Sequence, residues 1–241
     1  MRVPTTKLQN SFGKYLKHVL KGTEVIITKN GKGVAKINKY TDHRVGVINE
    51  EAADYMINKY MTYEEFLEIT ENSDGRYELI GGQIYLLASP SHGHQDIIRE
   101  INGQMYNYFS NKPCDNYTSP YDVKLYNDAE CFEDDPNVVQ PDILVICDFE
   151  NVDENHRYQG KPTLVVEVLS KSTRSKDLVK KLNLYMMSDI PEYWIVNPMD
   201  KTIHIYRFKN REIDEMAHFE MGDEIKSFVF SNLIIKTDKL L

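Results

Sequence analysis

Gln140-Pro141-Asp142 and Leu164-Val165-Val166-Glu167-Val168-Leu169-Ser170 carry the strongest structural signal in this sequence. Each stretch places a carboxylate within an apolar run that is typical of a buried strand. An unpaired charge in such a place is costly, so a cation must compensate it. A divalent metal ion is the best candidate, because it prefers carboxylate oxygens as ligands. The pattern therefore predicts Asp142 and Glu167 at neighbouring strand ends around a metal site.

Strands and helices alternate through the chain after residue 61, which indicates an α/β domain with helices flanking a central mixed sheet. The expected strands cover 83–87, 121–126, 138–146, 162–168, 192–196 and 202–208. The expected helices cover about 93–110 and 174–188, and the C-terminal end is rich in β structure.

The charge of the chain is divided unevenly. Residues 1–45 contain ten Lys and Arg against two Asp and Glu, whereas the remainder contains 19 against 35. Such asymmetry is typical of a basic module that attracts polyanions joined to an acidic domain, although a solvated basic surface gives the same pattern. We expect a small module over 1–45, a linker helix over 46–60 and the main domain over 61–241.

The N-terminal module has the pattern of one helix and one hairpin. Thr6 and Gln9 form a capping-box pair, and an apolar helical face follows them. The strand 24–28 leads into Asn30-Gly31, which is a strong hairpin signal. One helix and one hairpin cannot bury enough apolar surface to be stable alone. We therefore expect the chain to form a homodimer through this module.

The sequence also indicates a cytoplasmic protein. It has no apolar run approaching the roughly 18 residues that cross a bilayer, and its first residues lack the apolar region of a signal peptide. Its three cysteines are odd in number and lack metal-type spacing, which predicts reduced thiols.

The main domain resembles the Uma-type family of restriction-endonuclease-like proteins, a branch of the PD-(D/E)XK nuclease superfamily. The resemblance covers about residues 61–208 and depends on five stretches in order: 76–82, 140–143, 165–170, Asp177 with Lys181 and Tyr185, and 191–196. It implies a restriction-endonuclease-like core that hydrolyses DNA phosphodiester bonds with Mg²⁺ or Mn²⁺.

Each acidic residue has a candidate role. Asp142 and Glu167 at neighbouring strand ends can ligate one Mg²⁺ ion, with the carbonyl of Val168 as a third ligand, and the resemblance implies that Glu78 completes or orients the site. Alternatively, Asp142 caps a turn, Glu167 pairs with a nearby lysine, and Glu78 forms a surface salt bridge with Arg76.

The lysine that the superfamily places two residues after the second acid is absent, because Leu169 stands there. Lys181 lies beside the apolar face of its helix, so its ammonium group can take the place of the absent lysine in the site. Lys180 points away from that face. Lys171 is the competitor. Lys181 could instead be a lysine that snorkels at the edge of the core.

Two further residues are candidates for substrate contact. His94 matches a family position near the site and could contact phosphate or assist proton transfer. His92 and His94 together are weak evidence for zinc. Tyr185 packs against the sheet and could reach the site with its hydroxyl group.

Residues 1–40 resemble the N-terminal domain of Phd/YefM-type antitoxins, through Thr5-Thr6-Lys7-Leu8, 10–16 and 24–32. This resemblance implies a module that dimerises and binds DNA. Two functions follow for the chain: a metal-dependent DNA endonuclease, or a non-catalytic DNA-binding regulator that uses the nuclease fold as a scaffold.

Overall fold

The computed structural model describes residues 1–4, 7, 15, 25–29, 32–37, 60–127, 131–154, 156–170 and 176–240. The chain forms two compact units, Met1–Arg44 and Val45–Leu241, which are described separately here. The expected linker helix over 46–60 lies outside the described residues, apart from Tyr60.

The small unit contains a three-stranded sheet in the order β1-β2-β3, formed by β1 (Arg2–Pro4), β2 (Val25–Lys29) and β3 (Lys32–Ile37). The antiparallel pair β2–β3 confirms the predicted hairpin. The parallel strand β1 was not predicted, and Val3 from this strand packs with Val25 in a small core. Of the expected first helix, the structure describes Lys7 and Tyr15, which are helical.

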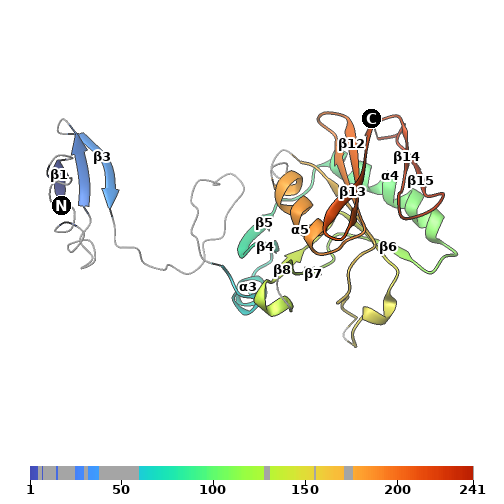
Figure 1. The fold of residues 1–241 in the computed structure, drawn as a ribbon, viewed down its shortest axis with the longest axis horizontal. Helices are drawn as coiled ribbons and strands as arrows, with labels where there is room; N and C mark the ends of the chain where they lie inside the picture. The colour runs from blue at the N-terminus through green and yellow to red at the C-terminus, as the bar shows by residue number, and fades with distance from the viewer. Residues whose placement is uncertain are drawn as a thin grey trace. The chain divides into compact units, whose positions relative to one another are not determined.

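The large unit is a mixed α/β fold, as the sequence predicts (Figure 1). Its helical elements are α3 (Tyr63–Thr70), α4 (His92–Phe109), η2 (Phe132–Asp134), η3 (Phe149–Asn151), η4 (Lys176–Lys181) and α5 (Leu182–Met187). Its strands are β4 (Arg76–Ile80), β5 (Gln83–Leu87), β6 (Asp115–Thr118), β7 (Val123–Leu125), β8 (Asn137–Val139), β9 (Ile143–Ile146), β10 (Leu164–Val168), β11 (Glu192–Asn197), β12 (Thr202–Lys209), β13 (Glu212–Glu220), β14 (Glu224–Lys226) and β15 (Ile234–Lys236).

Two sheets of the large unit matter for the site. A six-stranded sheet has the order β13-β12-β11-β10-β9-β6, and a four-stranded sheet has the order β5-β4-β8-β7. The pair β10–β11 is parallel and the pair β10–β9 is antiparallel, so the larger sheet is mixed. A short antiparallel pair, β14–β15, completes the C-terminal end.

The prediction of a single strand over 138–146 is wrong. The structure has two strands there, β8 and β9, and they belong to different sheets. Residues 140–142 lie between them, and Pro141 has no N–H group with which to continue a ladder. Asp142 is therefore at the junction of the two sheets.

The central strand β10 is buried along its whole length, and its two faces pack against different helices. Leu164, Val166 and Val168 share a hydrophobic core with the apolar face of α4. Val165 and Leu169 share a second core with Leu184 and Tyr185 of α5. Because side chains alternate along a strand, Glu167 lies on the same face as Val165, toward α5.

The prediction of three reduced cysteines is wrong for two of them. Cys114 and Cys147 form a disulfide bond, and Cys131 is free and exposed. Asp115 of β6 pairs with Ile146 of the antiparallel strand β9. Because Cys114 precedes Asp115 and Cys147 follows Ile146, the two cysteines stand opposite each other. Within the described parts of the chain, no helix is long and apolar enough to span a membrane.

Candidate active site

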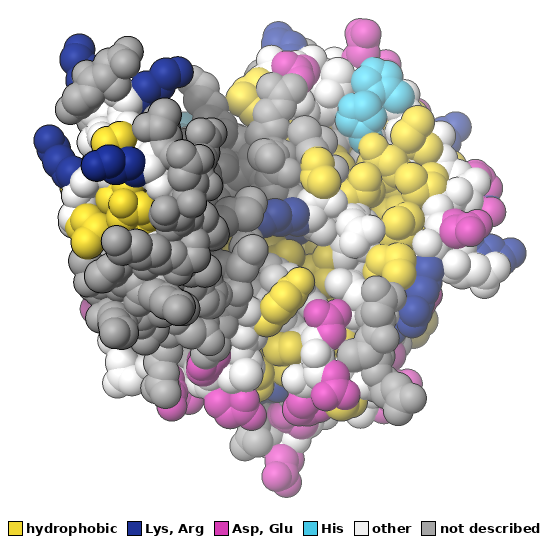
Figure 2. All heavy atoms as spheres, turned by 60° about the vertical axis from the view of Figure 1, so that its left-hand side comes forward, with side chains coloured by type: hydrophobic (Ala, Val, Ile, Leu, Met, Phe, Trp, Pro, Cys, Tyr) yellow, Lys and Arg dark blue, Asp and Glu magenta, His cyan; other side chains and the backbone are white. Residues whose placement is uncertain are grey.

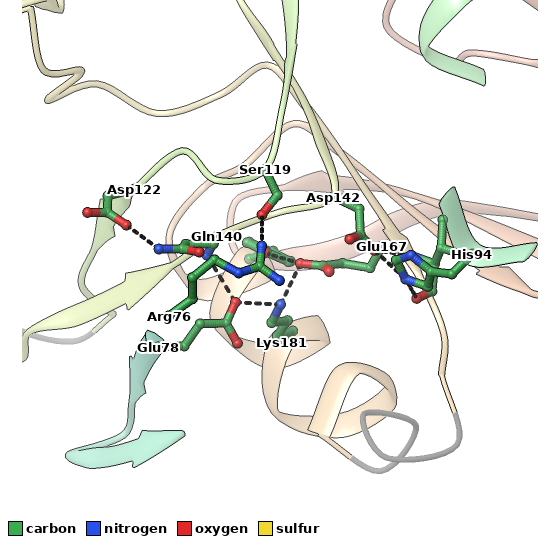
Figure 3. Close-up of polar contacts among 11 residues, drawn as sticks. Arg76, Glu78, His94, Ser119, Asp122, Gln140, Asp142, Glu167 and Lys181 are labelled. Atoms are coloured by element: carbon green, nitrogen blue, oxygen red, sulfur yellow. Dashed lines mark hydrogen bonds and ion pairs between the residues drawn. The ribbon is translucent and has the colours of Figure 1, made fainter. Parts of the chain in front are cut away.

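A buried ion cluster joins the two sheets (Figure 3). The Lys181 Nζ atom lies 2.8 Å from Glu78 Oε1 on β4 and 2.7 Å from Glu167 Oε1 on β10. The side chains of Lys181, Glu78 and Glu167 are 3 %, 0 % and 4 % exposed. Burial of two carboxylates is sustainable here because the ammonium group offsets their charge at hydrogen-bonding distance.

Tyr185 adds a second donor to this cluster. Its hydroxyl group donates a hydrogen bond to Glu167 Oε1 at 2.7 Å. Complete burial, and then the nearby Glu167 carboxylate, raise the pKa of the Tyr185 hydroxyl well above its ordinary value. The hydroxyl therefore keeps its proton and acts as a donor. Lys181 ends η4 and Tyr185 lies one turn later on α5, so both reach Glu167 from the same helix face.

Glu78 does not form the surface salt bridge with Arg76 that was considered as an alternative. It is fully buried, and its Oε1 atom accepts a hydrogen bond from the backbone N–H of Gln140 at 2.9 Å. Arg76 instead donates from Nη1 to Ser119 Oγ at 3.1 Å. Glu78 thus ties β4 to the segment that carries Asp142.

Asp142 lies in a different environment from Glu167. Its Oδ2 atom accepts a hydrogen bond from the backbone N–H of Val168 at 2.8 Å, and its side chain is 17 % exposed. His94 Nε2 lies 3.4 Å from the same oxygen and 2.8 Å from the Val168 carbonyl oxygen. Because a carbonyl oxygen can only accept, His94 carries its proton on Nε2 in this arrangement.

The two predicted histidines do not act together. His92 is exposed and its Nε2 atom lies 3.1 Å from Asp96 Oδ2, whereas only His94 reaches the acids. Ser91 caps α4 by accepting a hydrogen bond from the His94 backbone N–H, which fixes this histidine in the first turn of the helix.

The structure separates the three lysine candidates. Lys181 reaches the acids, and Lys180 is exposed and contacts Gln83 and Tyr85 instead. Lys171 lies outside the described residues. Leu169 is buried in the core against α5, where it makes an apolar contact, and the ammonium group beside the acids is that of Lys181.

Glu78, Asp142, Glu167, Lys181 and His94 line one cleft of about 550 Å³ between β4, α4 and the ends of β9 and β10. Arg76 and Gln140 also line it, and the sequence did not single them out, although both lie in the stretches that carry the family resemblance. Among the described residues, no three His, Cys, Asp or Glu side chains alone form a metal-binding group. A metal here would need the Val168 carbonyl or water in addition to carboxylates.

A mixed sheet with carboxylates and a lysine gathered at one junction is typical of nucleases of the restriction-endonuclease type. Residues 63–236 match the family described as "Uma2: Putative restriction endonuclease", and the chain therefore belongs to this family.

Two individual proteins are similar to the chain. The uncharacterized protein slr1290 of Synechocystis sp. is 28% identical over 172 residues, which are 70% of this chain and 86% of that protein. A crystal structure of "a putative nuclease belonging to DUF820" from Anabaena variabilis matches with a TM-score of 0.60 at 19% identity. The match covers 75% of this chain and 97% of that one, and it supports the fold.

Proposed function

We propose that the large unit is a metal-dependent DNA endonuclease whose metal is Mg²⁺ or Mn²⁺. One observation supports this most strongly: Glu78, Asp142, Glu167 and Lys181 gather from separate elements at one cleft. With all four ionised, the group has a formal charge of −2, which a divalent cation would neutralise.

The donor atoms suit a hard cation. Asp142 and Glu167 would hold the ion, and the Val168 carbonyl oxygen would be the third protein ligand, since it already lies beside Asp142 through the shared contact with His94. Mg²⁺ commonly takes one or two carboxylates and keeps several waters, so this small set is sufficient. When bound, such an ion supplies a more acidic water and offsets negative charge on the phosphate.

Lys181 has two roles in this proposal. Its ammonium group keeps Glu78 and Glu167 ionised and fixed, and it places positive charge at the edge of the cleft where a phosphate would arrive. Tyr185 donates to the same Glu167 oxygen as Lys181, so the two groups together fix the orientation of this carboxylate.

His94 is positioned to move a proton. Its Nε2–H group lies against Asp142 and Val168, the same atoms that would hold the ion, so binding requires this hydrogen bond to break or rearrange. The released imidazole would then contact a phosphate oxygen or accept a proton from water in the cleft.

Access to DNA is the second part of the proposal. Asp and Glu side chains gather along the lower edge of the face shown in Figure 2, which is unfavourable for a polyanion. The basic residues 1–45 would offset this repulsion as a Phd/YefM-like module that dimerises and binds DNA. Deleting residues 1–45 should then weaken DNA binding and reduce its dependence on salt.

Nicking of supercoiled plasmid by the full-length chain tests the catalytic proposal. We expect nicking with Mg²⁺ or Mn²⁺, none with EDTA, and none with Asp142→Asn purified in the same way. Asp96→Asn, which changes a surface acid of α4, is the matched control and should retain activity. If the wild-type chain binds DNA in a salt-sensitive way but never cleaves it, the non-catalytic regulator is the correct function.

A further inference from the structure

A second hollow, of about 450 Å³, adjoins the catalytic cleft. Arg76 and Gln140 line both spaces, so the two hollows are neighbours. Figure 3 shows the same continuity: the labelled side chains run from Asp142 past Arg76 and Gln140 to Asp122, which lines the second hollow. A strand of substrate leaving the acids in this direction would pass directly over it.

Five aromatic side chains line the second hollow: Tyr63, Phe66, Tyr77, Tyr121 and Tyr158. Phe66 and Tyr158 are buried, and the Tyr158 hydroxyl group is held by Asp148 Oδ1 at 2.7 Å. Tyr121 is partly exposed and packs on Tyr117, with ring centroids 5.4 Å apart. Packing on one side holds the Tyr121 ring while part of it stays open to the hollow, which suits it for stacking with a flat ligand.

Positive charge accompanies these rings. Arg76, Lys124 and Arg157 line the hollow, and within the described residues none of them has a carboxylate partner at ion-pair distance. The Lys124 ammonium group lies 4.7 Å from the centre of the Tyr63 ring instead. Two acids, Glu71 and Asp122, also line the hollow, and Asp122 accepts a hydrogen bond from Gln140 Nε2 at 2.9 Å. In a domain with excess acidic residues, three cations left without carboxylates point to an anionic ligand.

Gln140 gives an independent sign of a ligand. Its Oε1 atom is buried and has no hydrogen-bond partner among the described residues. A buried acceptor without a partner is destabilising, so such atoms are commonly satisfied by water or by a ligand. The N–H and amino groups of nucleobases are donors of the required kind.

We propose that the second hollow holds an unstacked nucleobase of the strand being cut, next to the scissile phosphate. Tyr121 would stack on the base, Gln140 would accept a hydrogen bond from it, and Arg76, Lys124 and Arg157 would hold the flanking phosphates. The substrate is then DNA with an unpaired or locally opened strand, rather than fully stacked duplex. This inference rests on the proposed nuclease function and specifies its substrate class.

Binding of fluorescently labelled oligonucleotides tests the inference apart from cleavage. The full-length Asp142→Asn chain would be titrated with single-stranded oligothymidylate and with an abasic oligonucleotide of the same length, which keeps the phosphates but lacks the bases. We expect the base-containing strand to bind about tenfold more tightly, because base–aromatic stacking contributes at this level. Adding Tyr121→Leu should remove most of that difference, whereas Tyr106→Leu, at an exposed tyrosine of α4, should leave it unchanged.

Each outcome separates the two proposals. Equal binding of both strands, or a base preference that survives Tyr121→Leu, overturns the nucleobase site while the nuclease stands. If neither strand binds, the nucleobase site is overturned, and the plasmid nicking assay alone decides the nuclease proposal. Lys124→Ala serves as a second variant if Tyr121→Leu does not fold, and it should weaken both strands by a similar factor because it removes a phosphate contact.

Discussion

Glu167 and Asp142 look equivalent in the sequence, and the structure places them in contrasting environments. Glu167 is buried on β10, and Lys181 and Tyr185 both bind its Oε1 atom. Asp142 lies between two strands, is partly exposed, and contacts a backbone N–H and His94. The difference indicates that the Glu167 side of the site contributes to the stability of the fold, whereas the Asp142 side is the one at which the proposed metal ion and substrate would enter.

Among the variants of this site, replacement of Lys181 should lower the stability of the fold most. Lys181→Met leaves two buried carboxylates without their cation, so we expect a loss of about 3–5 kcal/mol in the free energy of unfolding. Chemical denaturation followed by circular dichroism measures it. Lys180→Met, one residue away on the exposed side, should change stability by less than about 0.5 kcal/mol. A Lys181→Met chain as stable as the wild type would show that the acids are not both ionised.

Neutralising each acid in turn should separate stability from chemistry. Glu167→Gln leaves Lys181 paired with Glu78 but removes the charge that accepts hydrogen bonds from Lys181 and Tyr185, so it should cost about 2–3 kcal/mol of folding stability. Asp142→Asn should cost less than about 1 kcal/mol, because the side chain is partly exposed and an amide oxygen can still accept from Val168 N–H. Both should lose nicking activity by at least about 100-fold. Equal stability losses for the two variants would contradict the contrast between the acids.

Removing the Tyr185 hydroxyl group should lower stability less than removing the charge of Lys181 or of Glu167. Tyr185→Phe loses one hydrogen bond to a charged acceptor, which corresponds to about 1.5 kcal/mol. The raised pKa adds a pH signature: above pH 10 the unfolded tyrosine loses its proton before the folded one does, so stability falls as pH rises. The Tyr185→Phe chain should lose less stability than the wild type between pH 9 and 11. Tyr106→Phe, on the surface, should follow the wild type.

The sequence was sufficient to predict the parts of the site that depend on local periodicity. The helical spacing of Lys181 and Tyr185 predicts that both face the core, and the structure places both against Glu167. The antiparallel pairing of β2 with β3 follows from turn chemistry in the sequence in the same way. These signals lie within a few residues of each other, so no tertiary information is needed.

Features that depend on strand order could not be predicted. Pro141 is a sequence signal for the break at 140–142, but the assignment of β8 and β9 to different sheets depends on strand order, which an apolar run does not show. The pairing of Cys114 with Cys147 follows from the adjacency of β6 and β9, which are separated by other elements in the chain. The hydrogen bond from Arg76 to Ser119 could not be predicted either, because it joins β4 of one sheet to the residue that follows β6 of the other.

A crystal structure of the wild-type chain soaked in Mn²⁺ tests the central claim most directly, because anomalous scattering locates this ion unambiguously. The account predicts one strong peak within bonding distance of Asp142, Glu167 and the Val168 carbonyl oxygen, with His94 moved away from that oxygen. It also predicts that the peak is absent in Asp142→Asn crystals. A cleft that stays free of Mn²⁺ at saturating concentration, with His94 still bound to Val168, would contradict the account.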